Sequence, residues 1–169
     1  MRMTGTMRAL DETRGAVRVE DVYDTDIDDL WAACTTPERL ARWIAKVSGG
    51  LHEGETIHAV FTSTWSGEVR IDSCEAPHHL LLTTEPGTDD EGQLEAWLAP
   101  VGSQTKLVVE ERGLPIGSMH FHGAGWQVHL EDRPCAGARR PGPRRRLVGG
   151  EAGAGVARPL DRAHPGVPR

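Results

Sequence analysis

Near its start the chain alternates apolar and polar residues. Between Ala16 and Tyr23 the sequence reads AVRVEDVY, in which nearly every second side chain is apolar. A period of two is typical of a strand with one buried face, so a strand is expected here.

The next segment changes to a helical period. Apolar residues recur at the spacing of one helix face, at Ile27, Leu30, Trp31 and Cys34. Thr25 or Asp26 can cap the start of this short helix. A second helix, PERLARWIA, is expected from Pro37, because proline is tolerated at the first helical position. Gly49 and Gly50 would end it.

Further along, short segments with turn residues between them predict more strands. They read ETIHAVFTSTW, GEVRIDSCE, HLLLTTE, QLEAWLAP and TKLVVEERGL. Their connections are too short to hold helices, and short connections join antiparallel neighbours. Together with the first strand they predict a six-stranded antiparallel meander.

The last regular element is a helix that begins near His120. Trp126 and Leu130 lie one helical turn apart, but Arg133 and Pro134 occupy the positions where the stripe should continue. Proline should stop or kink the helix there. A helix this short cannot cover the whole sheet, and an apolar strip left exposed would favour a homodimer.

Charge divides the chain near Asp132. The net charge is −6, but residues 133–169 hold nine arginines against two acids, which leaves ten basic and 23 acidic residues before them. We expect a flexible N-terminus at 1–14, one domain at 15–132 and a disordered basic tail at 133–169. Three explanations of the tail stay open: a solvated terminus, an altered reading frame, and a nucleic-acid arm. The last is disfavoured because no aromatic residues are interleaved to stack bases.

Other classes of function find little support in the sequence. No apolar run approaches the length of a membrane span and the N-terminus lacks a signal peptide, so we expect a cytoplasmic protein without a membrane partner. The three cysteines are far apart and form no CxxC pair. His120 and His122 form an HxH pair, but no carboxylate completes a metal-binding pattern. We predict neither a metal nor another cofactor.

Two motifs resemble a known family. DLWAACTTPERLARWI, and LVVEERGL followed by GAGWQVHLED, are similar to segments of the family named for the activator of the heat-shock protein 90 ATPase. That family belongs to the START-like, or SRPBCC, superfamily, and the resemblance covers about residues 16–132. It implies an α+β helix-grip fold, in which a curved six-stranded antiparallel sheet and two short helices meet a C-terminal helix.

The resemblance leaves the function open, because such domains include lipid carriers, cyclases and co-chaperone modules. Our first hypothesis is binding of a small apolar molecule in an internal cavity. The second is a cyclase-like or hydrolase-like enzyme that uses a cavity acid or base such as Glu110 or His129. The third is a module that interacts with a chaperone.

Tryptophans on separate elements carry the ligand hypothesis, since a sheet capped by a helix would gather them around an apolar pocket. The alternative is that they only fill the core. The residues expected to point inward are Trp43, Ile57, Phe61, Trp65, Leu82, Leu94, Trp97, Val109, Trp126 and His129. No residue is assigned as catalytic.

Overall fold

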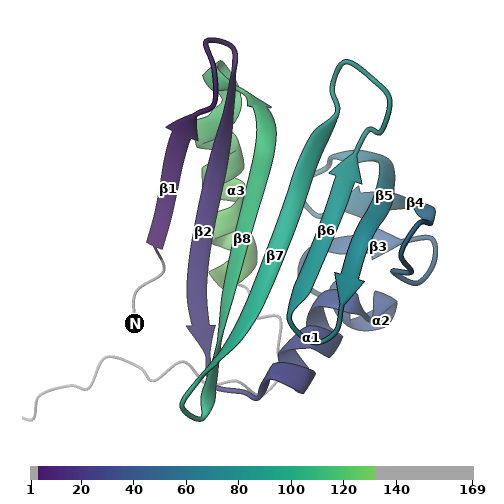
Figure 1. Cartoon of the computed structure of the whole chain (residues 1–169), viewed down its shortest axis with the longest axis vertical. Coiled ribbons are helices and arrows are strands. Elements are labelled where there is room, and N and C mark those ends of the chain that lie inside the picture. Colours follow the sequence, from purple (N-terminus) through teal and green to yellow (C-terminus); the bar gives the residue numbers. More distant parts are fainter. Residues whose placement is uncertain (1–3, 132–169) are drawn as a thin grey trace, which may run out of the picture.

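The computed structural model describes residues 4–131 of the chain, which form one curved antiparallel sheet and helices on its concave side (Figure 1). The strands are β1 (Thr4–Ala9), β2 (Arg14–Tyr23), β3 (Ala45–Val47), β4 (Thr56–Phe61), β5 (Ser66–Glu75), β6 (His79–Thr84), β7 (Gly92–Val101) and β8 (Gln104–Pro115). The helices are α1 (Ile27–Thr35), α2 (Pro37–Leu40), the short 3-10 helix η1 (Ile116–Ser118) and α3 (Met119–Glu131).

The sheet has the strand order β1-β2-β8-β7-β6-β5-β4-β3. Figure 1 shows α3 behind β1, β2 and β8, whereas α1 and α2 lie toward the other edge of the sheet. The α+β helix-grip class is confirmed, but the sheet has eight strands and not six.

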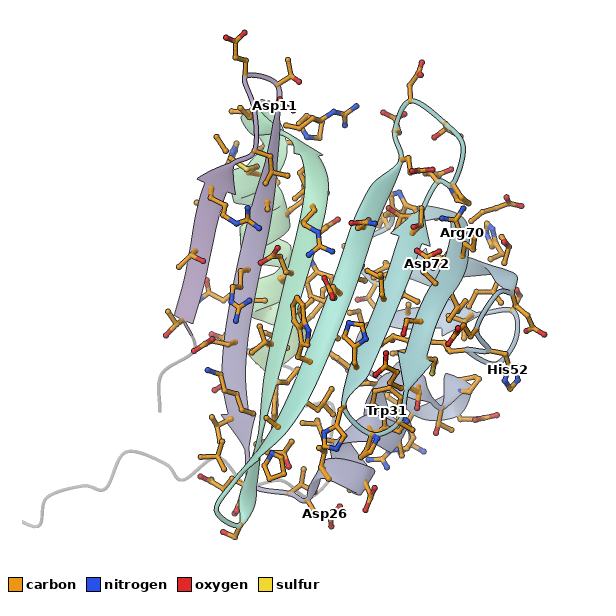
Figure 2. The ribbon with its side chains drawn as sticks, viewed as in Figure 1. Asp11, Asp26, Trp31, His52, Arg70 and Asp72 are labelled. Carbon is orange, nitrogen blue, oxygen red and sulfur yellow. The ribbon has the colours of Figure 1, made fainter. Side chains whose placement is uncertain are left out.

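The first additional strand corrects the expectation of a flexible N-terminus. Residues Thr4–Ala9 pair antiparallel with β2, from Thr4 opposite Glu20 to Ala9 opposite Gly15. All six residues of β1 are exposed, so the segment carries no burial pattern that sequence analysis could detect. Backbone hydrogen bonding to the edge of β2 holds it in place. In the turn that follows, Asp11 accepts hydrogen bonds from the backbone of Thr13 and Arg14 (Figure 2).

The second additional strand replaces the end of the expected second helix. Helix α2 stops at Leu40, a turn follows, and Ala45 begins β3, which pairs with β4. The backbone amide of Thr62 donates a hydrogen bond of 2.8 Å to the carbonyl of Ile44, which directs the chain into the sheet. The helix therefore ends well before the two glycines expected to terminate it.

Helices α1 and α3 form where the sequence predicts them. Asp26 caps α1 by accepting a hydrogen bond of 2.9 Å from the amide of Asp29, at the lower end of the molecule in Figure 2. At the other end of the chain, the Tyr23 hydroxyl donates a hydrogen bond of 3.0 Å to the carbonyl of Leu130, which fixes the last turn of α3 on β2. The basic segment 133–169, its proposed explanations and the stop at Pro134 lie outside the described residues.

Candidate functional site

An apolar cavity of about 70 Å³ lies between the sheet and the helices. Seven of the ten residues expected to point inward line it: Trp43, Ile57, Phe61, Leu82, Leu94, Val109 and Trp126. The strand residues among them come from β4, β6, β7 and β8, whose alternate side chains face the helices. The cavity is therefore a product of the predicted alternation of side chains along the strands.

A larger groove of about 630 Å³ adjoins the cavity. The two hollows share Phe61, Leu94 and Trp126 as wall residues. Trp65 and His129, the eighth and ninth of the predicted residues, line the groove and not the cavity. Trp65 packs edge to face against Phe61, with ring centroids 5.3 Å apart, and so extends the aromatic wall outward.

The groove contains a polar cluster around the carboxylate of Glu111 on β8. Its Oε2 atom accepts a hydrogen bond of 2.6 Å from the indole Nε1 of Trp126 and lies 3.2 Å from Nδ1 of His122. Both partners belong to α3. The hydrogen bond to Glu111, supported by its negative charge, raises the pKa of His122 above its ordinary value. The carboxylate of Glu111 therefore favours the protonated form of the His122 ring.

His129 plays a different part at the same wall. Its Nδ1 atom lies 3.2 Å from the carbonyl oxygen of Trp43 and 3.2 Å from the hydroxyl of Thr62. A carbonyl oxygen only accepts, so Nδ1 carries the hydrogen in that contact. His129 thereby fastens α3 to the turn before β3 and to the residue that follows β4, in addition to its edge-on contact with Trp126.

The sequence of the domain matches a family described as "Activator of Hsp90 ATPase homolog 1-like protein" over residues 24–133. The chain belongs to this family. The resemblance in the two sequence motifs is thereby confirmed, and so is the START-like, or SRPBCC, architecture. No curated protein matches the chain in sequence.

Solved structures share the fold of this family member at low sequence identity. CalU16 from Micromonospora echinospora is 24% identical with a TM-score of 0.65, over 78% of this chain and 83% of that chain. DynU16, from the dynemicin biosynthetic locus, is 24% identical with a TM-score of 0.64, over 69% of this chain and 45% of its own. MLL2253 from Mesorhizobium loti is 19% identical with a TM-score of 0.63, over 69% of this chain and 92% of its own. These similarities show the fold alone.

Trp97, the tenth residue predicted to point inward, lines neither hollow. It lies on the opposite face of the sheet, opposite His79 and Val108 in register, with the guanidinium of Arg18 5.6 Å from its ring centroid. Leu94 faces the cavity, and a residue three positions along a strand must face the other way. The expectation that both line one pocket was wrong for this reason.

Glu110 lies on the same outer face as Trp97 and so cannot act as a cavity base. Its carboxylate is 2.7 Å from Arg8, 3.2 Å from Arg112 and 3.7 Å from Arg18. Burial alone would raise the pKa of Glu110, but hydrogen bonds from Arg112 and Arg8 and their charges lower it overall. The inward carboxylate is its neighbour Glu111.

Replacement of Glu110 by glutamine tests this arrangement. The folded-state pKa of Glu110 is lowered, so its ionised form adds stability above its unfolded pKa of about 4.3, and this stability is lost as the pH falls below that value. At pH 7 we expect Glu110→Gln to lose about 1–2 kcal/mol in urea unfolding, because solvent screens the partly exposed arginines. The difference from wild type should shrink as the pH falls below about 4.3 and through the lowered folded-state pKa of Glu110.

Glu68→Gln is the matched control, since Glu68 is exposed and makes no salt bridge within residues 4–131. A loss of stability in Glu110→Gln that is equal at pH 7 and pH 3 would assign the effect to packing and not to charge.

Other site residues could have been found from the sequence by strand parity. Leu80, Ala96 and Leu107 line the cavity, and each lies two positions from a residue that was predicted to point inward. Cys34 and Leu51 come from irregular or helical segments and had no such pattern.

The described residues contain neither a metal-binding cluster of side chains nor a membrane-spanning helix. Within residues 4–131, no three His, Cys, Asp or Glu side chains are placed to share a metal ion. In the same range no helix is long and apolar enough to cross a membrane. The chaperone, homodimer and cytoplasmic assignments stay predictions.

Proposed function

We propose that this protein binds a small, mainly apolar molecule whose apolar end enters the inner cavity and whose remainder lies in the groove. The observation that carries the proposal is that the two hollows adjoin, with Phe61, Leu94 and Trp126 lining both of them. An apolar recess with a few polar groups at its mouth is the usual form of a small-molecule site.

The sizes of the hollows favour this two-part arrangement over a fully enclosed ligand. The inner cavity, at about 70 Å³, is smaller than the cavities of roughly 150 Å³ that hold benzene. The groove, at about 630 Å³, lies within the range of roughly 300–1,000 Å³ common for ligand sites. A ligand larger than benzene therefore needs both spaces.

Filling the cavity tests the proposal. Ala59 is buried on β4 and lines the cavity, so Ala59→Leu places three further carbon atoms in the space meant for the ligand. We expect the neutral fluorophore N-phenyl-1-naphthylamine to bind wild type saturably and Ala59→Leu at least about tenfold more weakly, since one excluded ring edge costs over 1.4 kcal/mol of apolar contact. Titration by fluorescence measures both dissociation constants.

Ala99→Leu is the matched control, because Ala99 is an exposed residue of β7 and the same atoms are added outside both hollows. Thermal unfolding of both variants establishes that they are folded. The proposal fails if wild type shows no saturable binding, or if Ala59→Leu and Ala99→Leu bind the fluorophore equally well.

A further inference from the structure

The His122 ring has one nitrogen engaged and one that faces the groove without a partner. Nδ1 contacts Glu111, while Nε2 makes no hydrogen bond to any residue in the described range 4–131. The side chain of His122 is 38% exposed and lines the groove. Trp126, which shares the Glu111 oxygen, is also a wall of the inner cavity. Through Glu111, His122 is thus held beside a residue that borders both hollows.

The contact with Glu111 decides which nitrogen of His122 keeps its hydrogen. An ionised carboxylate only accepts hydrogen bonds, so Nδ1 must donate to it in every protonation state that keeps the contact. Protonation then changes only Nε2. The imidazolium has a hydrogen on Nε2 and donates, whereas the neutral ring has a lone pair there and accepts.

We propose that Nε2 of His122 donates a hydrogen bond to a carbonyl oxygen of the apolar ligand, while Glu111 and Trp126 hold the ring in place. This inference rests on the proposed function, because it assigns the head group of the same ligand. The ligand class is thus an apolar molecule with a ketone, ester or amide carbonyl.

The charges around the groove favour a neutral carbonyl over a carboxylate. When His122 is protonated, His122 and Glu111 together are neutral, and the remaining acids of the wall, Glu85 and Asp90, would repel an anion. Arg14 is occupied by hydrogen bonds to the backbone carbonyls of Gly113 and Asp89. The ionisable side chains contributed by the elements around the groove are Arg14, Glu85, Asp90, Glu111, Arg112, His122 and His129.

Two of these groups are turned to other partners. The guanidinium of Arg112 pairs with Glu95 and Glu110 on the outer face of the sheet. Nδ1 of His129 is taken by Trp43 and Thr62. His129 is also buried, with 6% of the residue exposed, whereas 38% of the His122 side chain is exposed. Of the two histidines in the wall, His122 is therefore better placed to donate to a bound carbonyl.

The same geometry makes the affinity for the ligand depend on pH. Glu111 raises the pKa of His122 above its ordinary value of about 6.5, so Nε2 donates below the raised value and accepts above it. A carbonyl oxygen cannot donate to an accepting nitrogen. Affinity for a carbonyl ligand should thus fall as the pH rises through the pKa of His122. The affinity for a ligand without the carbonyl should not change with pH.

A pair of fluorescent probes tests the proposal on the full chain. The ketone is 6-propionyl-2-(dimethylamino)naphthalene, and its partner, 2-(dimethylamino)naphthalene, lacks the acyl group. We expect wild type to bind the ketone at least about tenfold more tightly at pH 6 than at pH 9, which is the size of one charge-assisted hydrogen bond. The partner probe should change by less than about twofold.

Variants assign the effect to His122. His122→Phe keeps a ring but no donor, so it should bind the ketone about tenfold more weakly at pH 6 and lose the pH dependence. His120→Phe is the control, since His120 is exposed on α3 and outside both hollows. Glu111→Gln still accepts from Nδ1 but lacks the charge that raises the pKa, so the midpoint of ketone binding should move to lower pH.

The outcomes separate the two proposals. If neither probe binds wild type, the cavity function is wrong and the head-group assignment falls with it. If both probes bind and His122→Phe leaves the ketone affinity and its pH profile unchanged, the cavity function stands and the role of His122 is overturned. A shifted midpoint in Glu111→Gln supports the assignment, and an unmoved midpoint contradicts it.

Discussion

Replacing Leu30 by alanine is expected to lower the free energy of unfolding by about 3–5 kcal/mol, close to the upper range for a buried leucine. Leu30 in α1 is wholly buried and belongs to the main core, but it lines neither hollow. The truncation removes contacts on every side and leaves a new void that close-packed neighbours cannot fill. Urea unfolding followed by circular dichroism measures the change.

Leu82→Ala is the matched variant for this prediction. Leu82 is also a buried leucine, but it faces the existing cavity and so lacks partner atoms on one side. We expect its loss to be smaller than that of Leu30→Ala by about 1 kcal/mol or more. Equal losses would mean that the space next to Leu82 is filled in solution.

Most of the sheet could be predicted because a strand with one buried face has apolar residues at every second position. Strand β4 is the clearest case: Ile57 and Ala59 are buried, while His58 and Val60 are exposed. Strand β1 has no buried side chain, so its sequence shows no such alternation. The second helix was predicted to be too long because the turn after Leu40 still has a helix-like hydrogen bond, from the Ile44 amide to the Leu40 carbonyl. Sequence spacing alone cannot distinguish such a turn from a longer helix.

The candidate site was predictable in its apolar part and not in its polar part. Strand parity places Leu94 inward and Trp97 outward, so the error at Trp97 could have been avoided from sequence. The same parity puts Glu111 on the face of Val109. Its contact with His122 could not be foreseen, because it depends on how α3 is rotated against β8. The cavity volume could not be predicted either. It is the small difference between the space enclosed by the fold and the volume of the side chains that fill it, and both depend on the packed structure.

The wall between the two hollows leads to the second large effect. Trp126 is buried, borders both the cavity and the groove, and donates its indole hydrogen to Glu111. Trp126→Ala should cost about 3–5 kcal/mol of stability, because it removes a large buried aromatic side chain and one of the two hydrogen bonds to a half-buried carboxylate. It should also join the two hollows into one chamber with an indole-shaped space in it.

That space makes the prediction specific, because a ligand that binds only the folded state raises stability by mass action. Added indole should therefore raise the melting temperature of Trp126→Ala while leaving wild type unchanged, as measured by thermal unfolding at increasing indole concentration. Trp97→Ala is the control: Trp97 lies on the outer face, where its removal opens no enclosed space, so indole should not rescue it. Rescue of both variants would point to general binding of indole, and rescue of neither would mean that α3 collapses onto the sheet when its tryptophan is lost. Only selective rescue of Trp126→Ala fits a tryptophan that stands between two adjacent hollows.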